Sequence, residues 1–107
     1  MSKQASPDAQ PESLAREGER LIEAGDLRGA IEAFTKAIRR RGSADLYLAR
    51  GRACEAVGEA KAALADYTKA VEASPSDVEC RLARARLASE LGQTDTVIAD
   101  CSEALRA

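Results

Sequence analysis

The sequence has no histidine and no tryptophan, and aromatic residues make up only 3% of its 107 positions. Histidine is the side chain that most often serves as a general base or a neutral metal ligand near neutral pH. The three cysteines, Cys54, Cys80 and Cys101, are widely spaced and form no CxxC pair, so they assemble neither a zinc site nor a cysteine–histidine nucleophile. We therefore expect no catalysis, no metal and no cofactor.

Long hydrophobic runs and an excess of one charge are also missing. No stretch approaches the ~18 apolar residues of a membrane-spanning helix, and residues 1–11 lack the basic start and apolar run of a signal peptide. With 16 Lys+Arg against 18 Asp+Glu, the net charge of -2 gives no general attraction to phosphate or anionic lipid. Together with unpaired cysteines, this composition favours a soluble cytoplasmic protein that binds neither nucleic acid nor membrane.

One helical stripe of apolar residues occurs three times in the chain. Its members are spaced i, i+1, i+4, i+7 and i+8, which matches one face of a helix and not the period of a strand. The stripe comprises Ala30, Ile31, Phe34, Ala37 and Ile38, then Ala63, Leu64, Tyr67, Ala70 and Val71, then Val97, Ile98, Cys101, Ala104 and Leu105. Upstream of each copy, Gly25, Gly58 and Gly92 stand at the same offset, and each predicts a helix end followed by a tight turn.

A second helical stripe precedes each glycine, so the repeating unit is a hairpin of two helices. We predict an all-α fold of six helices in three hairpins, at about residues 11–43, 44–77 and 78–107. Residues 1–10 are rich in Ser, Gln, Pro and Asp and are predicted to form a disordered tail. Each hairpin buries too little alone, so stacking has to supply the core.

The alignment of the first hairpin on the second involves a choice. The tripeptide Leu-Ala-Arg begins at Leu14, Leu48 and Leu82, whereas the glycines imply one residue fewer between the first two hairpins. We align Gly18 with Gly51, because a small residue where two helices cross constrains packing more than a shared surface tripeptide. The Leu-Ala-Arg of the first hairpin is then a coincidence.

The pattern resembles the tetratricopeptide repeat, with a bulky, a small and a large residue followed by glycine, alanine, an aromatic residue, alanine and proline. The second unit matches best, through Tyr47, Gly51, Cys54, Gly58, Ala63, Tyr67, Ala70 and Pro75. The third unit departs most, with Arg81, Val97 and Cys101 at the bulky, alanine and aromatic positions. The resemblance covers about residues 11–107 and implies a right-handed α-solenoid that serves as a protein-binding scaffold and not as an enzyme.

In a tetratricopeptide stack, the first helices of the hairpins line a concave groove. By this resemblance, the groove positions here include Leu48, Arg52, Leu82, Arg86, Glu19 and Ala49. Two leucines beside two arginines predict a binding site for a partner segment with apolar and acidic groups. The alternative is a solvated helix face on which arginine stems cover alanine.

The best-known groove of the family holds the acidic C-terminal tail of heat-shock chaperones in a carboxylate clamp of Lys, Asn, Asn, Lys and Arg. The matching positions in this sequence are Ala15, Glu19, Ala49, Glu79 and Ala83. None carries the clamp residue, and Glu19 and Glu79 carry the opposite charge. We therefore predict no chaperone-tail binding of this type.

The cysteines differ in their expected surroundings. Cys54 and Cys101 fall on apolar positions of the repeat and are predicted to pack as small core residues. Cys80 lies near the start of a helix and is predicted to be the more exposed thiol.

The outer edge of the last stripe has no further hairpin to cover it. Val97, Ile98, Cys101 and Leu105 are therefore predicted to form an interface with a second copy as a homodimer, with another chain, or with the rest of a longer protein. Two hypotheses follow. One is a scaffold that binds a protein or peptide through the groove or the C-terminal edge; the other is a structural or oligomerisation element, or a regulatory fragment, that uses the C-terminal helix alone.

Overall fold

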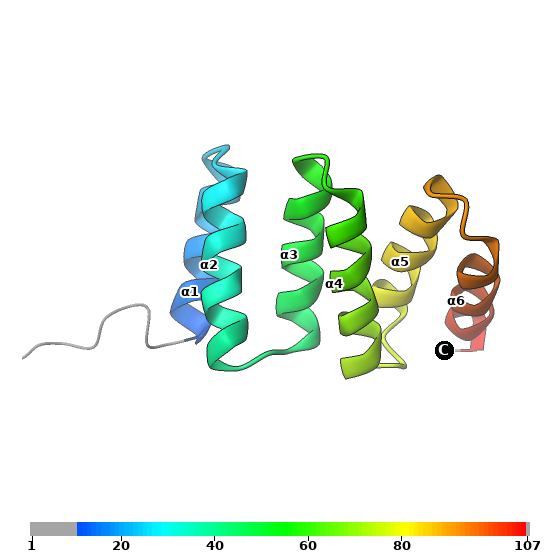
Figure 1. Cartoon of the computed structure of the whole chain (residues 1–107). Helices are drawn as coiled ribbons and strands as arrows, with labels where there is room; N and C mark the ends of the chain where they lie inside the picture. The colour runs from blue at the N-terminus through cyan, green and yellow to red at the C-terminus, as the bar shows by residue number, and fades with distance from the viewer. Residues whose placement is uncertain (1–10, 107) are drawn as a thin grey trace, which may run out of the picture.

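Six α-helices in consecutive pairs make up the described chain, and the pairs stand side by side in a row (Figure 1). The structure is a computed structural model that describes residues 11–106, except for the side chains of residues 94–97 and 104. The predicted tail at residues 1–10 lies outside the described residues. The helices are α1 (Pro11–Glu23), α2 (Leu27–Arg40), α3 (Ala44–Ala56), α4 (Ala60–Ala73), α5 (Val78–Glu90) and α6 (Thr94–Arg106). None of these described helices is long and apolar enough to cross a lipid bilayer.

The turn inside each hairpin is built on a glycine with positive φ. Gly25, Gly58 and Gly92 have φ values of 87°, 88° and 79°, a region that residues with a side chain rarely adopt. The amide that follows each glycine donates back into the preceding helix, and these bonds run from Asp26 N to Leu21 O, from Glu59 N to Cys54 O and from Gln93 N to Ala88 O. This is the Schellman pattern of a helix end, and it confirms the helix ends predicted from the glycines.

The connections between hairpins explain why the repeat spacing changes. Residues 41–43 separate α2 from α3, whereas residues 74–77 separate α4 from α5. The last residue of each connection caps the next helix: Ser43 Oγ accepts from Leu46 N at 3.3 Å, and Asp77 Oδ1 accepts from Glu79 N at 2.9 Å. The additional residue therefore lies in a loop.

Within a hairpin, the two helices cross where a glycine meets an aromatic ring. A Cβ atom on Gly18 would lie 2.6 Å from Phe34 Cε1, and a Cβ on Gly51 would lie 2.6 Å from Tyr67 Cε1. Both rings are completely buried, so neither leaves space for a methyl group. These equivalent contacts confirm the alignment of Gly18 with Gly51.

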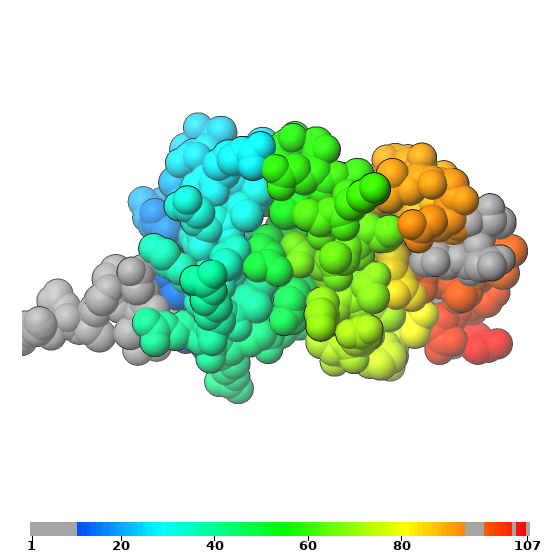
Figure 2. Space-filling view, in the orientation of Figure 1, coloured from blue at the N-terminus to red at the C-terminus, as the bar shows by residue number. Residues whose placement is uncertain are grey.

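Neighbouring hairpins share apolar clusters. One cluster joins the first hairpin to α3 and consists of Leu14, Ala30, Phe34, Ala37 and Leu46. A second joins the second hairpin to α5 and includes Leu48, Cys54, Tyr67, Val71, Cys80, Ala83 and Leu87. In the space-filling view the hairpins accordingly pack directly against one another (Figure 2). Apolar burial thus runs from hairpin to hairpin, as stacking requires.

Candidate functional site

The predicted groove positions lie on α1, α3 and α5, the first helices of the hairpins. Three positions recur there at equivalent places, and they are Glu12, Asp45 and Glu79, then Ala15, Leu48 and Leu82, then Glu19, Arg52 and Arg86. The first position is acidic in every hairpin, whereas the third changes from glutamate in α1 to arginine in α3 and α5. The predicted groove is therefore acidic at α1 and of mixed charge between α3 and α5.

The two groove arginines form ion pairs that cross between α3 and α5. Arg52 Nη2 donates to Glu79 Oε2 at 2.6 Å. Arg86 donates through both terminal nitrogens to the Glu55 carboxylate, at 2.7 and 2.9 Å. Both arginine side chains remain 53% exposed. A partner with acidic groups would therefore compete with carboxylates of the chain itself.

Glu55 lies at the centre of this arrangement. Besides the bonds from Arg86, its Oε1 accepts a hydrogen bond from Tyr67 Oη of α4 at 2.6 Å. The hydrogen bonds from Arg86, helped by that from Tyr67, lower the pKa of Glu55 against the opposing effect of burial. Burial, followed by the hydrogen bond to Glu55, raises the pKa of Tyr67. Glu55 is thus an anion and Tyr67 a neutral donor at physiological pH.

The predicted apolar anchors of the groove differ in exposure. Leu48 is 5% exposed because α5 packs over it, whereas Leu82 at the equivalent place on α5 is 48% exposed. Leu48 therefore offers almost no surface to a partner. Ala49 is half-buried against the first cluster, and Glu19 is exposed. The assignment of these residues to a partner stays a prediction.

A hollow of about 370 Å³ opens beside α1, where the connection at residues 41–43 enters α3. Its lining combines carboxylates, one guanidinium and apolar groups, from Pro11, Glu12, Ala15, Arg41, Ser43, Asp45 and Leu46. Glu12, Ala15 and Asp45 also belong to the recurring groove positions. The hollow therefore extends the predicted groove at its α1 end.

Two of the three cysteine predictions are wrong. Cys54 is buried, as predicted, but Cys80 is completely buried and Cys101 is exposed. Cys80 lies on the side of α5 that packs on the second hairpin, where burial raises the pKa of its thiol to about 11. Cys101 takes the place that Tyr67 has in the second hairpin, yet it is exposed at the outer side of α6. The burial of this position therefore depends on a neighbouring hairpin.

A buried arginine–aspartate pair recurs in the second and third hairpins and was not predicted. Arg50 of α3 donates to both carboxylate oxygens of Asp66 in α4, at 2.8 and 2.9 Å, and Arg84 of α5 donates to both of Asp100 in α6, at 2.6 Å each. The two aspartates are 5% and 0% exposed. These arginines end the Leu-Ala-Arg tripeptides that begin at Leu48 and Leu82, so the interpretation of the tripeptide as a surface feature is wrong for its arginine. The common separation of 16 residues was the available signal.

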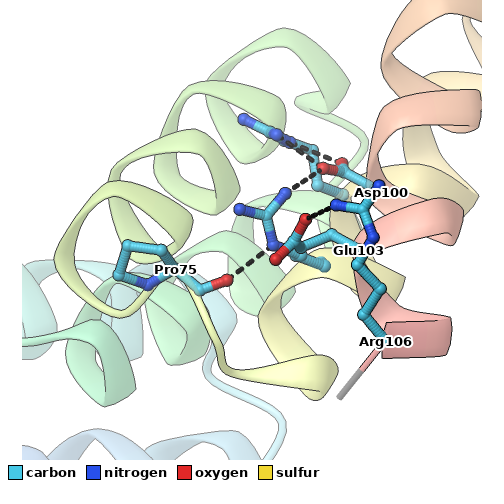
Figure 3. A network of polar contacts seen from close by, with 6 residues as sticks. Pro75, Asp100, Glu103 and Arg106 are labelled. Carbon is cyan, nitrogen blue, oxygen red and sulfur yellow. Dashed lines mark hydrogen bonds and ion pairs between the residues drawn. The ribbon is translucent and has the colours of Figure 1, made fainter.

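A second arginine joins this pair in the third hairpin (Figure 3). Arg81 Nη1 donates to Asp100 Oδ1 at 3.1 Å, and Arg81 Nε donates to the Pro75 carbonyl at 2.6 Å. The hydrogen bonds to Asp100 raise the pKa of Arg84. Asp100 thus ties α6 to α5 and, through Arg81, to the connection that precedes α5.

The predicted C-terminal interface is exposed where it is described. Ile98 is 60% and Leu105 88% exposed, and Cys101 is exposed, while the side chain of Val97 lies outside the described residues. Their equivalents in the second hairpin, Leu64, Val71 and Tyr67, contribute to one cluster together with Leu48. We therefore treat Leu82, Ile98, Cys101 and Leu105 as one surface, the C-terminal face.

Helical hairpins stacked in a row, each packed on the next, define a helical repeat solenoid. The sequence model of the tetratricopeptide repeat matches residues 44–87, which comprise the second hairpin and most of α5. This match confirms the predicted resemblance to the tetratricopeptide repeat, and the six described helices confirm the predicted all-α fold. No curated protein matches the sequence.

Solved structures share this fold over more than nine-tenths of the chain. MamA superposes with a TM-score of 0.82 at 20% identity, covering 92% of this chain and 54% of MamA. The second tetratricopeptide domain of Spaghetti (RPAP3), bound to the HSP90 peptide SRMEEVD, gives 0.83 at 24% identity and 92% coverage of both chains. The domain of Arabidopsis OM64 gives 0.81 at 24% identity, covering 94% of this chain and 84% of that one. This chain therefore spans just over half the length of MamA.

Proposed function

We propose that the chain is a protein-interaction module that binds a segment of a partner protein across α3 and α5. The observation that carries this proposal is the half-exposed Leu82 standing one helical turn from Arg86, with Arg52 on the adjacent helix. A surface that combines one apolar side chain with two guanidinium groups suits a segment that offers both apolar and acidic groups. The match to the tetratricopeptide repeat, a family of interaction scaffolds, supports the same role. We infer that the chain has no catalytic activity.

The two arginines would contribute differently to such a complex. Glu79, the partner of Arg52, is 61% exposed, so replacing it by a carboxylate of the bound segment costs little. Glu55, the partner of Arg86, is only 22% exposed and also accepts from Tyr67. We therefore expect Arg52 to exchange its carboxylate on binding and Arg86 to keep Glu55.

A displayed library of short random peptides tests this proposal. Peptides selected on the wild-type protein should bind the double variant Arg52→Ala, Leu82→Ala about tenfold or more weakly, because both anchors are removed. Arg28→Ala is the matched control, since Arg28 forms another exposed pair, with Glu59 at 2.7 Å, outside the predicted groove. Equal binding to the double variant, or the absence of any selected peptide, would contradict the groove proposal.

Acidic chaperone tails should not bind in this groove. The RPAP3 domain holds the peptide SRMEEVD, but a carboxylate tail here would meet Glu19 and Glu79, both exposed, where the clamp has donors. We expect calorimetric titration with SRMEEVD to show no low-micromolar binding, with the RPAP3 domain as positive control. Tight binding that weakens with added salt would show that the clamp assignment is wrong.

Assembly through the C-terminal face is the second candidate function, and the exposure of Ile98 and Leu105 favours it. It includes the alternatives of a structural element and of a regulatory part of a longer protein. Leu105→Glu separates the two candidates, because it should disrupt a complex made through this face and leave groove binding intact. The single variant Arg52→Ala leaves all four residues of the C-terminal face unchanged, so it should weaken groove binding and leave a complex made through this face intact.

A further inference from the structure

The C-terminal face repeats a surface that is covered elsewhere in the same molecule. Leu82 and Leu105 are 48% and 88% exposed, whereas their equivalents Leu48 and Val71 are each 5% exposed. The difference arises because α5 packs over the second hairpin, contacting it through Cys80, Ala83 and Leu87. The molecule thus contains its own example of what fits such a face, namely a helix that presents small and apolar side chains.

The two helices that cover a preceding hairpin share one residue pattern. On α3 the buried side is formed by Leu46, Ala49 and Ala53, and on α5 by Cys80, Ala83 and Leu87. Both sets have the spacing i, i+3 and i+7, which is one stripe of a helix. Both helices also carry an arginine at i+4, which is Arg50 in α3 and Arg84 in α5.

In α3, the arginine of this pattern also contacts the hairpin that α3 covers. Arg50 Nη1 donates to Thr35 Oγ1 of α2 at 3.1 Å. The equivalent of Thr35 in the third hairpin is Ser102, which is exposed and carries the same kind of hydroxyl acceptor. The C-terminal face therefore offers both the apolar surface and a hydroxyl for an arginine of a covering helix.

The first helix of a second copy does not have this pattern. The positions of α1 equivalent to Leu46, Ala49 and Ala53 are occupied by Ser13, Arg16 and Arg20, and we name these three residues the N-terminal face. Arg16 and Arg20 are exposed, and Arg20 forms an ion pair with Glu17. Burying two guanidinium groups against Leu82 and Leu105 is unfavourable. Head-to-tail stacking of identical chains is therefore disfavoured.

We propose that the C-terminal face binds one amphipathic helix of a partner chain, which presents small or apolar side chains at i, i+3 and i+7 and an arginine at i+4. The inference rests on the proposed function as an interaction module, but the surface it uses shares only Leu82 with the proposed groove site. The partner helix takes the place on the third hairpin that α5 takes on the second, and its arginine donates to Ser102.

The probe for this inference is a helix-stapled peptide with the sequence of residues 78–90, in which alanine replaces Cys80. The readout is the rate at which Cys101 of the full chain is alkylated by N-ethylmaleimide. Cys101 lies on the C-terminal face, while Cys54 and Cys80 are buried, so Cys101 reports directly on whether this face is covered. When about nine-tenths of the protein is bound, the alkylation rate should fall about tenfold.

Three controls make the result specific. The same peptide with Ala83→Glu and Leu87→Glu should give no protection. Leu105→Glu in the protein should abolish protection by the original peptide, whereas Ile22→Glu should not, because Ile22 is an exposed apolar residue on α1, away from the C-terminal face. Replacing Ser102 by alanine should weaken protection without abolishing it.

Full reactivity of Cys101 at saturating peptide concentrations would overturn the inference, as would equal protection by the control peptide. Protection that needs no peptide, rises with protein concentration and accompanies a doubled mass in solution would overturn it in favour of a second copy. If peptides selected on the groove bind while Cys101 stays reactive, this inference fails and the proposed function stands. If Cys101 is protected by the stapled peptide while no peptide is selected on the groove, the groove proposal fails and this inference stands.

Discussion

Glu55 accepts hydrogen bonds from two different helices, and this determines how the groove responds to acid. Its partners are Arg86, 31 residues further along the chain, and Tyr67, 12 residues further. The role of Glu55 depends on the stacking of α5 beside α3, which the repeat pattern alone does not describe. The repeat pattern therefore yields candidate groove positions, which stay a prediction, and it could not yield the pairing of their charges.

The stabilisation provided by Glu55 should depend on pH. Folding lowers the pKa of this carboxylate, so its contribution to stability is present above the ordinary glutamate pKa, near 4.3, and is lost as the pH falls through the lowered value. We expect Glu55→Gln to reduce the free energy of unfolding by about 1 kcal/mol at neutral pH and by much less near pH 3.

Urea unfolding of both proteins at the two pH values measures this difference. Glu103→Gln is the matched control, because Glu103 forms an exposed pair with Arg106 at 3.0 Å, and it should change stability little at either pH. An effect of Glu55→Gln that is the same at both pH values would contradict the assignment.

At the scale of the helix, the packing of α6 on its hairpin partner depends on ion pairs more than the packing of α4 does. Both helices place an aspartate against an arginine of the preceding helix, but α4 also buries the Tyr67 ring against Gly51. In α6 the equivalent of that ring is Cys101, which is exposed. We therefore expect Asp100 to contribute more to the stability of α6 than Asp66 contributes to the stability of α4.

Removing the Asp100 carboxylate should loosen α6 selectively. Asp100→Ala leaves Arg81 and Arg84 without this acceptor, and we expect a loss of about 3 kcal/mol in the stability of α6. Amide hydrogen exchange would show faster exchange in α6 than in α3 and α4. Adding Arg84→Met should restore part of the loss, because one uncompensated charge is then removed. Uniformly faster exchange throughout the chain would argue against a local role.

Helix ends and hairpins were predictable from the sequence because their causes are local. A glycine with positive φ and an apolar stripe each act within a few residues, and Gly18 opposite Phe34 fixed the register. The exposure of Cys80 and Cys101 was predicted wrongly because it depends on which side of each helix a neighbouring hairpin covers. The buried Asp66 and Asp100 were missed because an aspartate on a helix is usually solvated.

At the scale of the whole molecule, the two ends of the stack differ. The N-terminal face presents Ser13, Arg16 and Arg20, whereas the C-terminal face presents leucine and isoleucine. Terminal repeats with a polar outer side keep a solenoid from extending. This condition is met on the first hairpin and not on the described surface of the third.

Making the N-terminal face apolar should therefore create head-to-tail assemblies. The triple variant Ser13→Leu, Arg16→Ala, Arg20→Ala copies the pattern of Leu46, Ala49 and Ala53 from α3. Such a heterologous contact does not close on itself, so we expect open oligomers that grow with concentration. Sedimentation velocity measures this growth, and adding Leu105→Glu should abolish it. A triple variant that sediments as the wild type does would contradict the assignment of the two faces.

The linear arrangement of the hairpins also has a kinetic consequence. The extensive contacts among the described helices join helices that follow one another in the chain, from α1 with α2 to α5 with α6. Such contacts close only short loops, which places a protein among the fast-folding topologies. The order of events along the folding pathway is then set by the relative stability of each hairpin, because no pairing between the two ends of the chain has to form first.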